Sequence, residues 1–285
     1  MSAPAALDPV AACAEEVRRH DNDRYLTALF APAEDRARLF ALYAFNLQIA
    51  RVRESVSEPI LGAVRLRFWR DAVTDLYTGK PPRHPATLTL AATGAAARLE
   101  RARLEALTDA RDADLKDEPP ADLAALVAYA EATGGALAAL ALDLLGVDGE
   151  ASRAAACDVG TAFALVGLVR AVPFHAATRR LYLPADRLAA AGVDREALFT
   201  GKSGNKLGSV VGEVAHAAWR RLDRAAQAHR DVPRAALPAL LPAVLARRDL
   251  IRLERAGFDP FAATSAVSPL RRQLALLLFA AVGRY

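Results

Sequence analysis

Alanine- and leucine-rich stretches run through most of this 285-residue chain, while strand-forming residues are sparse and unclustered. Alanine and leucine have high helix propensity, whereas β-branched and aromatic residues favour strands. Only 6% of the residues are aromatic, and 53% are hydrophobic, which is enough to form a substantial core. The sequence therefore predicts an all-α fold in which helices pack as a bundle.

Proline, glycine and capping residues divide the helical pattern into segments. A charged stretch ending in two prolines, residues 110–120, is predicted to be a solvated loop. We find no linker-like composition and no internal repeat, so we expect a single domain over residues 1–285. The predicted long helices cover residues 9–30, 31–53, 59–78, 86–109, 120–145, 150–172, 205–230, 233–257 and 267–284. Two short helical pieces are expected near residues 184–191 and 194–200.

The segment 161–184 begins as an apolar helix with many small residues, and its first charge is Arg170. Pro173 is predicted to end or kink this helix, because proline lacks an amide hydrogen and its ring crowds the preceding turn. Four residues share one stripe of the helix: Ala164, Gly167, Ala171 and His175. Such a stripe indicates either close helix packing or the wall of a pocket.

The chain is mildly basic, with a formal net charge of +4 and mostly arginine as the basic residue. Nucleic-acid binding would need these arginines clustered on one element, and they are scattered, so we expect no nucleic-acid partner. Attraction to an anionic membrane surface remains an open alternative. The C-terminal apolar run 274–282 is too short to span a bilayer, which favours a core helix over a membrane anchor.

Residues 1–21 lack the cationic start and apolar core of a signal peptide, and their acidic residues argue against a transit peptide. Cys13 and Cys157 have no C-x-x-C spacing, so they suggest a reducing compartment and packing roles. No uninterrupted apolar run approaches the ~18 residues of a spanning helix. These features predict a cytoplasmic protein, with peripheral contact to the inner membrane as the open alternative.

The segment 161–184 resembles a signature of the squalene/phytoene synthase family, roughly Q-L-T-N-I-L-R-D-V-x-E-D-x-x-R-G-R-I-Y-L-P. The alignment needs no gap, and the residues that match it include Arg170, Arg180, Tyr182, Leu183 and Pro184. The family's Gln and Asn positions hold Ala164 and Gly167. Its two magnesium-binding aspartates fall on Ala171 and His175.

Two further stretches carry the same resemblance, which covers the chain from about Tyr25 to the C-terminal helices. Residues 41–46, ALYAFN, are similar to the family segment that precedes its first aspartate motif, D-x-x-x-D. In this register the aspartates fall on Ala50 and Glu54, and a diphosphate-binding arginine falls on Leu47. Residues 69–85 also resemble a family segment.

The resemblance implies an isoprenoid synthase fold, a helical bundle around a central cavity. Active members hold Mg²⁺ with four carboxylates and thereby neutralise a departing diphosphate. Only Glu54 survives here, and hard cations require several oxygen ligands. We therefore expect no metal and no cofactor. The alternative is an active Mg²⁺-dependent prenyltransferase whose further acids are not identified.

Residues 52–77 and 168–184 are similar to a branch of the family that contains a mitochondrial assembly factor of respiratory complex I. This implies a non-catalytic protein that assists complex I assembly through a complex I subunit and holds an isoprenoid or lipid in its cavity. A lipid carrier without a link to complex I is a third alternative. The candidate pocket residues are Tyr43, Leu47, Tyr129, Ala164, Gly167, Arg170, Arg180 and Tyr182.

Several of these residues also have a purely structural interpretation. Arg170 would form a salt bridge with Glu54 or another acid, because a buried arginine needs a partner. His175 has no second His or Cys at ligand spacing, which favours a hydrogen-bonded structural histidine over a zinc ligand. Tyrosines such as Tyr43, Tyr129 and Tyr182 are more often core residues than catalytic ones.

Overall fold

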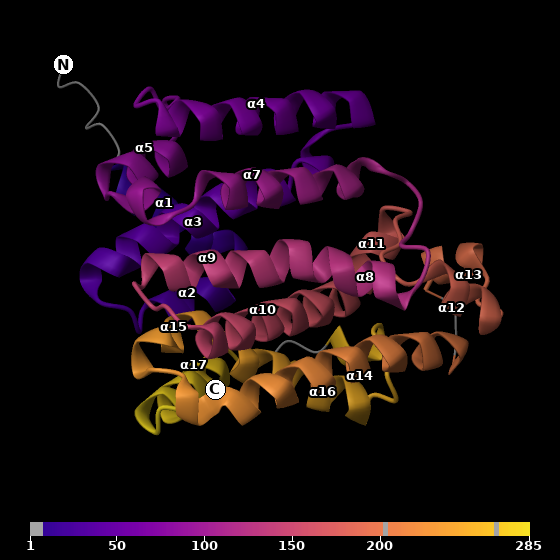
Figure 1. Ribbon diagram of the computed structural model, residues 1–285. Helices are drawn as coiled ribbons and strands as arrows, with labels where there is room; N and C mark the ends of the chain where they lie inside the picture. The colour runs from indigo at the N-terminus through magenta and orange to yellow at the C-terminus, as the bar shows by residue number, and fades with distance from the viewer. Residues whose placement is uncertain (1–7, 202–204, 265–267) are drawn as a thin grey trace, which may run out of the picture. The chain divides into compact units, whose positions relative to one another are not determined.

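The computed structural model describes residues 8–201, 205–264 and 268–285, and all regular structure among them is helical (Figure 1). The all-α prediction is therefore confirmed. The chain divides into two compact units: unit 1 comprises residues 1–115 and 140–148, and unit 2 comprises residues 116–139 and 149–285. That residues 1–285 form a single domain stays a prediction.

Unit 1 is built around helix α3 (Ala33–Ala50), which is buried on nearly all sides between Leu39 and Leu47. A helix that is apolar all round belongs in a core. Helices α1 (Pro9–His20) and α5 (Pro85–Ala92) pack against α3 and against each other. The remaining helices of unit 1 are α2 (Asn22–Ala28), α4 (Pro59–Tyr77), α6 (Ala95–Arg98) and α7 (Arg101–Asp109), followed by the last turn of α9 (Ala136–Leu144).

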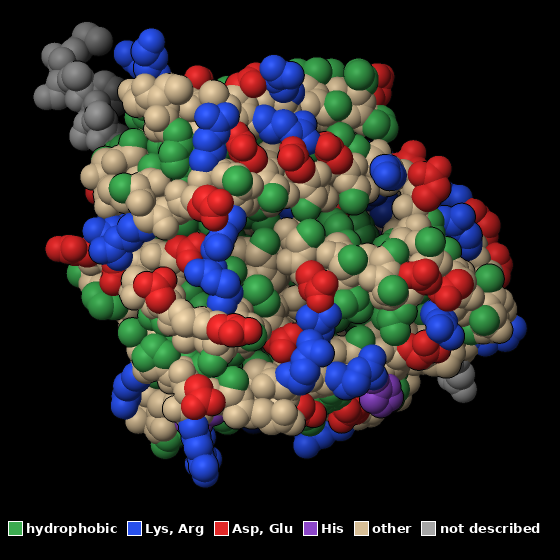
Figure 2. Space-filling view, viewed as in Figure 1, with side chains coloured by type: hydrophobic (Ala, Val, Ile, Leu, Met, Phe, Trp, Pro, Cys, Tyr) green, Lys and Arg blue, Asp and Glu red, His purple; other side chains and the backbone are tan. Residues whose placement is uncertain are grey.

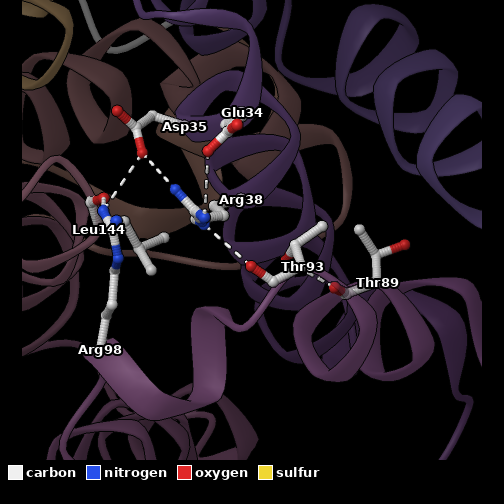
Figure 3. Close-up of polar contacts among 7 residues, drawn as sticks. All are labelled: Glu34, Asp35, Arg38, Thr89, Thr93, Arg98 and Leu144. Atoms are coloured by element: carbon white, nitrogen blue, oxygen red, sulfur yellow. Dashed lines mark hydrogen bonds and ion pairs between the residues drawn. The ribbon is translucent and has the colours of Figure 1, made fainter.

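A polar network around Arg38 joins three parts of unit 1 (Figure 3). Arg38 on α3 donates to Asp35 at 2.6 Å and to the carbonyl of Thr93, at the end of α5, at 2.9 Å. Arg98 donates to the same carboxylate at 3.2 Å and to the carbonyl of Leu144, at the end of α9, at 2.7 Å. The network therefore connects the first turns of α3 with the C-terminal ends of α5 and α9.

Three predicted boundaries in unit 1 were wrong. The helix expected over residues 9–30 is broken at Asp21, whose backbone is not helical and whose side-chain carboxylate caps α2 by accepting the Arg24 amide at 3.2 Å. The helix expected over 86–109 is broken into α5, α6 and α7, because Gly94 adopts a φ of 68° after α5, and Leu99 and Glu100 are extended after α6. The predicted loop over 110–120 begins with a 3-10 helix, Ala110–Leu115.

Unit 2 is built around α10 (Glu150–Arg170), which packs against α14 (Asn205–Gln227) and α16 (Pro242–Arg255). As predicted, the helix of Pro173 is interrupted: α10 ends at Arg170, and α11 (Val172–Ala177) follows. The other elements of unit 2 are α8 (Leu123–Ala130), a π-helical turn (Glu131–Gly135), the first turn of α9, α12 (Ala185–Ala190), α13 (Arg195–Phe199), α15 (Leu237–Leu240) and α17 (Pro269–Ala281).

The π-helical turn crosses α10 at a pair of glycines. A Cβ added to Gly134 would lie 2.6 Å from the Cβ of Ala164, and one added to Gly160 would lie 2.7 Å from the Cβ of Ala138. In each case the backbone oxygen of the other glycine would be closer still. Both positions therefore require glycine, and the small residues of α10 serve close packing here.

Two helical segments of the described chain, Leu123–Leu144 and Glu150–Arg170, are long and apolar enough on average to cross a membrane. Neither segment is an uninterrupted apolar run, because isolated polar residues lie within both, so the sequence did not predict a span here. A core helix passes the same test, and 61% of the Glu150–Arg170 window is buried. The finding is therefore weak evidence for a span. Residues 1–7, part of the N-terminal stretch considered for leader peptides, lie outside the described residues.

Candidate functional site

The first motif region lies in unit 1, where α3 ends and a 3-10 turn (Arg53–Ser55) follows. Ala50 is the last residue of α3 and offers no oxygen ligand from its side chain. Glu54 lies in the turn, and its carboxylate is 3.7 Å from the guanidinium of Arg51. Both side chains are about half exposed. This end of the motif therefore holds one carboxylate, already paired with a cation.

A pocket of about 540 Å³ opens beside this turn, within unit 1. Of the predicted residues, Leu47 and Glu54 line it, whereas Tyr43 is buried in the core with its pKa raised by loss of solvent. Most of the apolar lining comes from α4, a helix for which the sequence indicated no functional role. Its contribution is Val64, Phe68 and Trp69. The volume lies in the range of small-molecule sites.

Charged and neutral polar groups line the same pocket. Glu16 accepts a hydrogen bond from Gln48, and partial burial raises the pKa of its carboxyl. Arg51 and Arg65 contribute positive charge. Burial lowers the pKa of His84, whose Nδ1 accepts the amide hydrogen of Ala86. An uncharged imidazole and an apolar wall beside balanced charges suit a ligand with an apolar body and a polar end.

The second motif region lies in unit 2, where Ala171 follows α10 and His175 lies in α11. The amide of His175 donates to the carbonyl of Ala171 at 2.8 Å. The imidazole packs on Tyr182, with ring centroids 4.7 Å apart, and its Nδ1 is buried without a hydrogen-bond partner. Burial, and then the charge of Arg180, lower its pKa to about 4. The hydrogen-bonded histidine that we expected is therefore not found, and an uncharged ring packs there in its place.

Three of the predicted pocket residues, Tyr129, Arg180 and Tyr182, come together beside this ring. Tyr129 lies 6.2 Å from Tyr182 between ring centroids, and the guanidinium of Arg180 lies 5.8 Å from the same ring. Ala164 and Gly167 lie on α10, and Gly167 is exposed with open space where a Cβ would be.

Arg179, two residues after the end of α11, has a φ of 55°. This conformation favours glycine, and the family signature has glycine at this position.

Arg170, at the end of α10, pairs with Asp249 of α16 at 2.8 Å. Arg252 and Arg272 also donate to this carboxylate, at 2.7 and 3.4 Å. The Asp249 side chain is only 2% exposed. The salt-bridge alternative for Arg170 is therefore the one found, with an acid other than Glu54. Sequence reasoning missed Asp249, and its only signal was an acid in a basic stretch of an amphipathic helix.

The residues at the four motif positions do not fit a magnesium site. Ala50 and Ala171 have no donor atom, Glu54 pairs with Arg51, and His175 is a nitrogen ligand that a hard cation disfavours. Within the described part of the chain, no group of three or more His, Cys, Asp or Glu side chains could hold a metal ion.

The charged side chains of both signs are interspersed on the face of the molecule shown in Figure 2. The described residues include many ion pairs, such as Arg70 with Asp109 and Asp112, and Arg224 with Asp158. Nucleic-acid recognition uses a stripe or patch of one sign, and this face shows none.

Comparisons with known proteins agree with the resemblance. The sequence profile of the family described as squalene/phytoene synthase matches residues 17–277. Assembly factor 6 of NADH dehydrogenase (ubiquinone) complex I from Homo sapiens is 34% identical over 260 residues, covering 91% of this chain and 78% of the relative. Phytoene synthase from Rhodobacter capsulatus is 27% identical over 232 residues, 81% of this chain and 68% of that protein.

Solved structures show the same fold. A dehydrosqualene synthase superimposes with a TM-score of 0.81 and 18% identity, covering 96% of each chain. A squalene synthase from Alicyclobacillus acidocaldarius gives a TM-score of 0.77 with 18% identity, covering 89% of this chain and 95% of the other. The expected isoprenoid synthase fold is therefore confirmed.

Proposed function

Because this chain belongs to the squalene/phytoene synthase family yet lacks three of the four motif carboxylates, we propose that it is a non-catalytic member that assists assembly of respiratory complex I. The observation that carries the proposal is the pairing of this loss with 34% identity to a complex I assembly factor over most of both chains. The partner would be a complex I subunit or an assembly intermediate, at or near the inner membrane.

The charges of the motif positions support the non-catalytic part of the proposal. Prenyl transfer begins with a departing diphosphate, whose charge must be neutralised in place. Here Arg170 is engaged by Asp249, and Glu54 is engaged by Arg51. With alanine at two positions and an uncharged ring at His175, little is left among the motif residues to stabilise that anion.

The assembly role is tested by deleting the gene in its native host. We expect a loss of NADH:ubiquinone oxidoreductase activity and of the assembled complex on native gels, with succinate dehydrogenase unchanged as the control. Wild-type chain and Glu54→Gln should both restore the complex, because Glu54 contributes only a half-exposed ion pair. Normal complex I in the deletion strain would refute the role. Failure of Glu54→Gln alone would favour a metal-dependent enzyme.

Catalysis is tested separately with purified protein, farnesyl or geranylgeranyl diphosphate and Mg²⁺. We expect diphosphate release no faster than in buffer. Release above that rate would support the prenyltransferase alternative, whatever the outcome in cells.

We also propose that the unit 1 pocket holds an isoprenoid or lipid. Its apolar wall and charged rim support an amphipathic ligand, and the ligand can be sought by mass spectrometry of lipid extracted from purified protein. The variant Val64→Trp fills the pocket from an exposed position of α4, so it should lose bound lipid at an unchanged melting temperature. Equal lipid in variant and wild type, or none in either, would count against this pocket.

A further inference from the structure

The C-terminal helix α17 of unit 2 carries a continuous apolar ridge on its outer face. Five large aliphatic side chains form this ridge, and each is about half exposed or more. They are Leu270, Leu274, Leu277, Leu278 and Val282, with 61%, 49%, 55%, 68% and 66% of their surface exposed. Exposed apolar side chains gathered in this way mark an interaction surface, whereas single ones do not.

The opposite face of α17 packs against the rest of unit 2, so the helix has a separate buried face and the ridge is its solvent-exposed face. Ala275, Leu276 and Ala280 are buried, and α17 packs on α16 (Figure 1). Arg272 donates to the buried carboxylate of Asp249. Arg234 donates to the carbonyl of Ala280 at 3.0 Å, and this anchors the last turn.

The charges around the ridge have one sign. Residues 269–285 contain three arginines and no aspartate or glutamate. Arg272 forms a salt bridge with Asp249, whereas Arg271 and Arg284 are exposed at the two ends of the ridge. The exposed apolar residues of α4 lie among charges of both signs, with Glu58 and Asp71 beside Arg65 and Arg67. The stretch that carries the α17 ridge differs in having no acidic side chain, which suits an anionic surface.

We propose that α17 docks unit 2 on an anionic lipid surface, lying in the plane of the interface with its ridge among the acyl chains. An interfacial helix has an aliphatic face with basic flanks, and α17 carries both on a face that unit 2 leaves open. The ridge consists of flexible aliphatic side chains, which suits a fluid surface. Arg271 and Arg284 then meet lipid phosphates.

The test is cosedimentation of the full chain with vesicles of phosphatidylcholine, with or without phosphatidylglycerol. We expect binding to the anionic vesicles, weaker binding to the neutral ones, and weakening by salt. The variant Leu274→Gln/Leu277→Gln/Leu278→Gln should lower the anionic affinity by about 100-fold or more, because each leucine buried in hydrocarbon contributes about tenfold. The control, Ile60→Gln/Leu61→Gln at exposed positions of α4 outside the pocket, should bind like wild type.

A second variant, Arg271→Gln/Arg284→Gln, leaves the apolar ridge intact and guards against misfolding of the first. It should lose about fivefold of anionic affinity per arginine and keep its neutral binding. The proposal is overturned if wild type does not bind anionic vesicles, if the leucine variant binds as well as wild type, or if the α4 control loses as much. The proposal would also be overturned if wild type forms a concentration-dependent dimer and the leucine variant is monomeric, because a second copy of the chain would then cover the ridge.

Discussion

The glycine pair at the crossing of the π-helical turn and α10 gives a sharp prediction about the packing of unit 2. In Gly160→Ala the new methyl group would lie 2.7 Å from the Cβ of Ala138 and closer still to the carbonyl oxygen of Gly134. An ordinary contact needs at least 3.4 Å, and both neighbours belong to helix backbone or to its first side-chain atom. The two helices must therefore move apart along much of their length.

The expected magnitude follows from two opposing effects. Overpacking a close contact costs about 1–3 kcal/mol, and more where backbone must shift. Alanine in place of glycine inside a helix contributes a gain of about 1 kcal/mol. We expect a net loss of about 1–2 kcal/mol, which corresponds to a melting temperature lowered by roughly 2–8 °C for a unit of this size.

The matched control is Gly167→Ala, the same substitution in the same helix, where nothing lies within 4 Å of the new methyl group. It should raise the melting temperature slightly, because only the helix-propensity gain remains. Thermal unfolding followed by circular dichroism compares the two variants. If Gly160→Ala proves as stable as Gly167→Ala, Gly160 does not lie in close contact with Gly134 and Ala138, and the reasoning is refuted.

Three further predictions concern single interactions. Asp249→Ala should cost about 1–3 kcal/mol, because it leaves three partly exposed arginines without the buried carboxylate that they share, whereas Asp223→Ala removes only an exposed pair and should cost under about 1 kcal/mol; denaturant unfolding measures both. His175 has a pKa of about 4 in the fold against 6.5 in an open chain, so the unfolded chain binds more protons between these values, and stability should fall as the pH drops from 6.5 to 4. His175→Asn should flatten that fall in unfolding midpoints measured across the window, and an unchanged slope would show that another group causes it. Asp21→Ala removes the α2 cap and should cost about 1–2 kcal/mol, visible as a lower urea midpoint at an unchanged slope, while an unshifted midpoint would mean that the cap contributes nothing.

Helix positions could be predicted where a residue has one strong effect on the backbone. Pro59 and Pro85 begin helices, and the helix that contains Pro173 is interrupted where the sequence predicted. The breaks at Asp21 and Gly94 were missed, because each residue also occurs inside helices at a cost of about 1 kcal/mol. Tertiary contacts easily decide a difference of that size.

The candidate site was harder to predict, because its geometry depends on partners distant in sequence. The sequence indicated that Arg170 needs an acid, but only the packing of α16 on α10 selects Asp249. The pocket in unit 1 is lined by Leu47, a predicted pocket residue, and by Glu54, a motif position, yet its apolar wall comes largely from Phe68 and Trp69 of α4. Helical periodicity places side chains on a face and cannot say which other helix meets it.

The family residues that this chain keeps and those that it lacks differ in their physical roles. Of the residues that remain, Arg170 joins α10 to α16 through its salt bridge with Asp249, and Leu183 is buried in the core. The metal-ligand positions have become two alanines and a buried, uncharged His175, and the surviving Glu54 is paired. A diphosphate at Arg170 would have to compete with Asp249 for the guanidinium. Because Glu54 contributes only a half-exposed ion pair, the prediction that Glu54→Gln still supports complex I assembly follows from the same contacts.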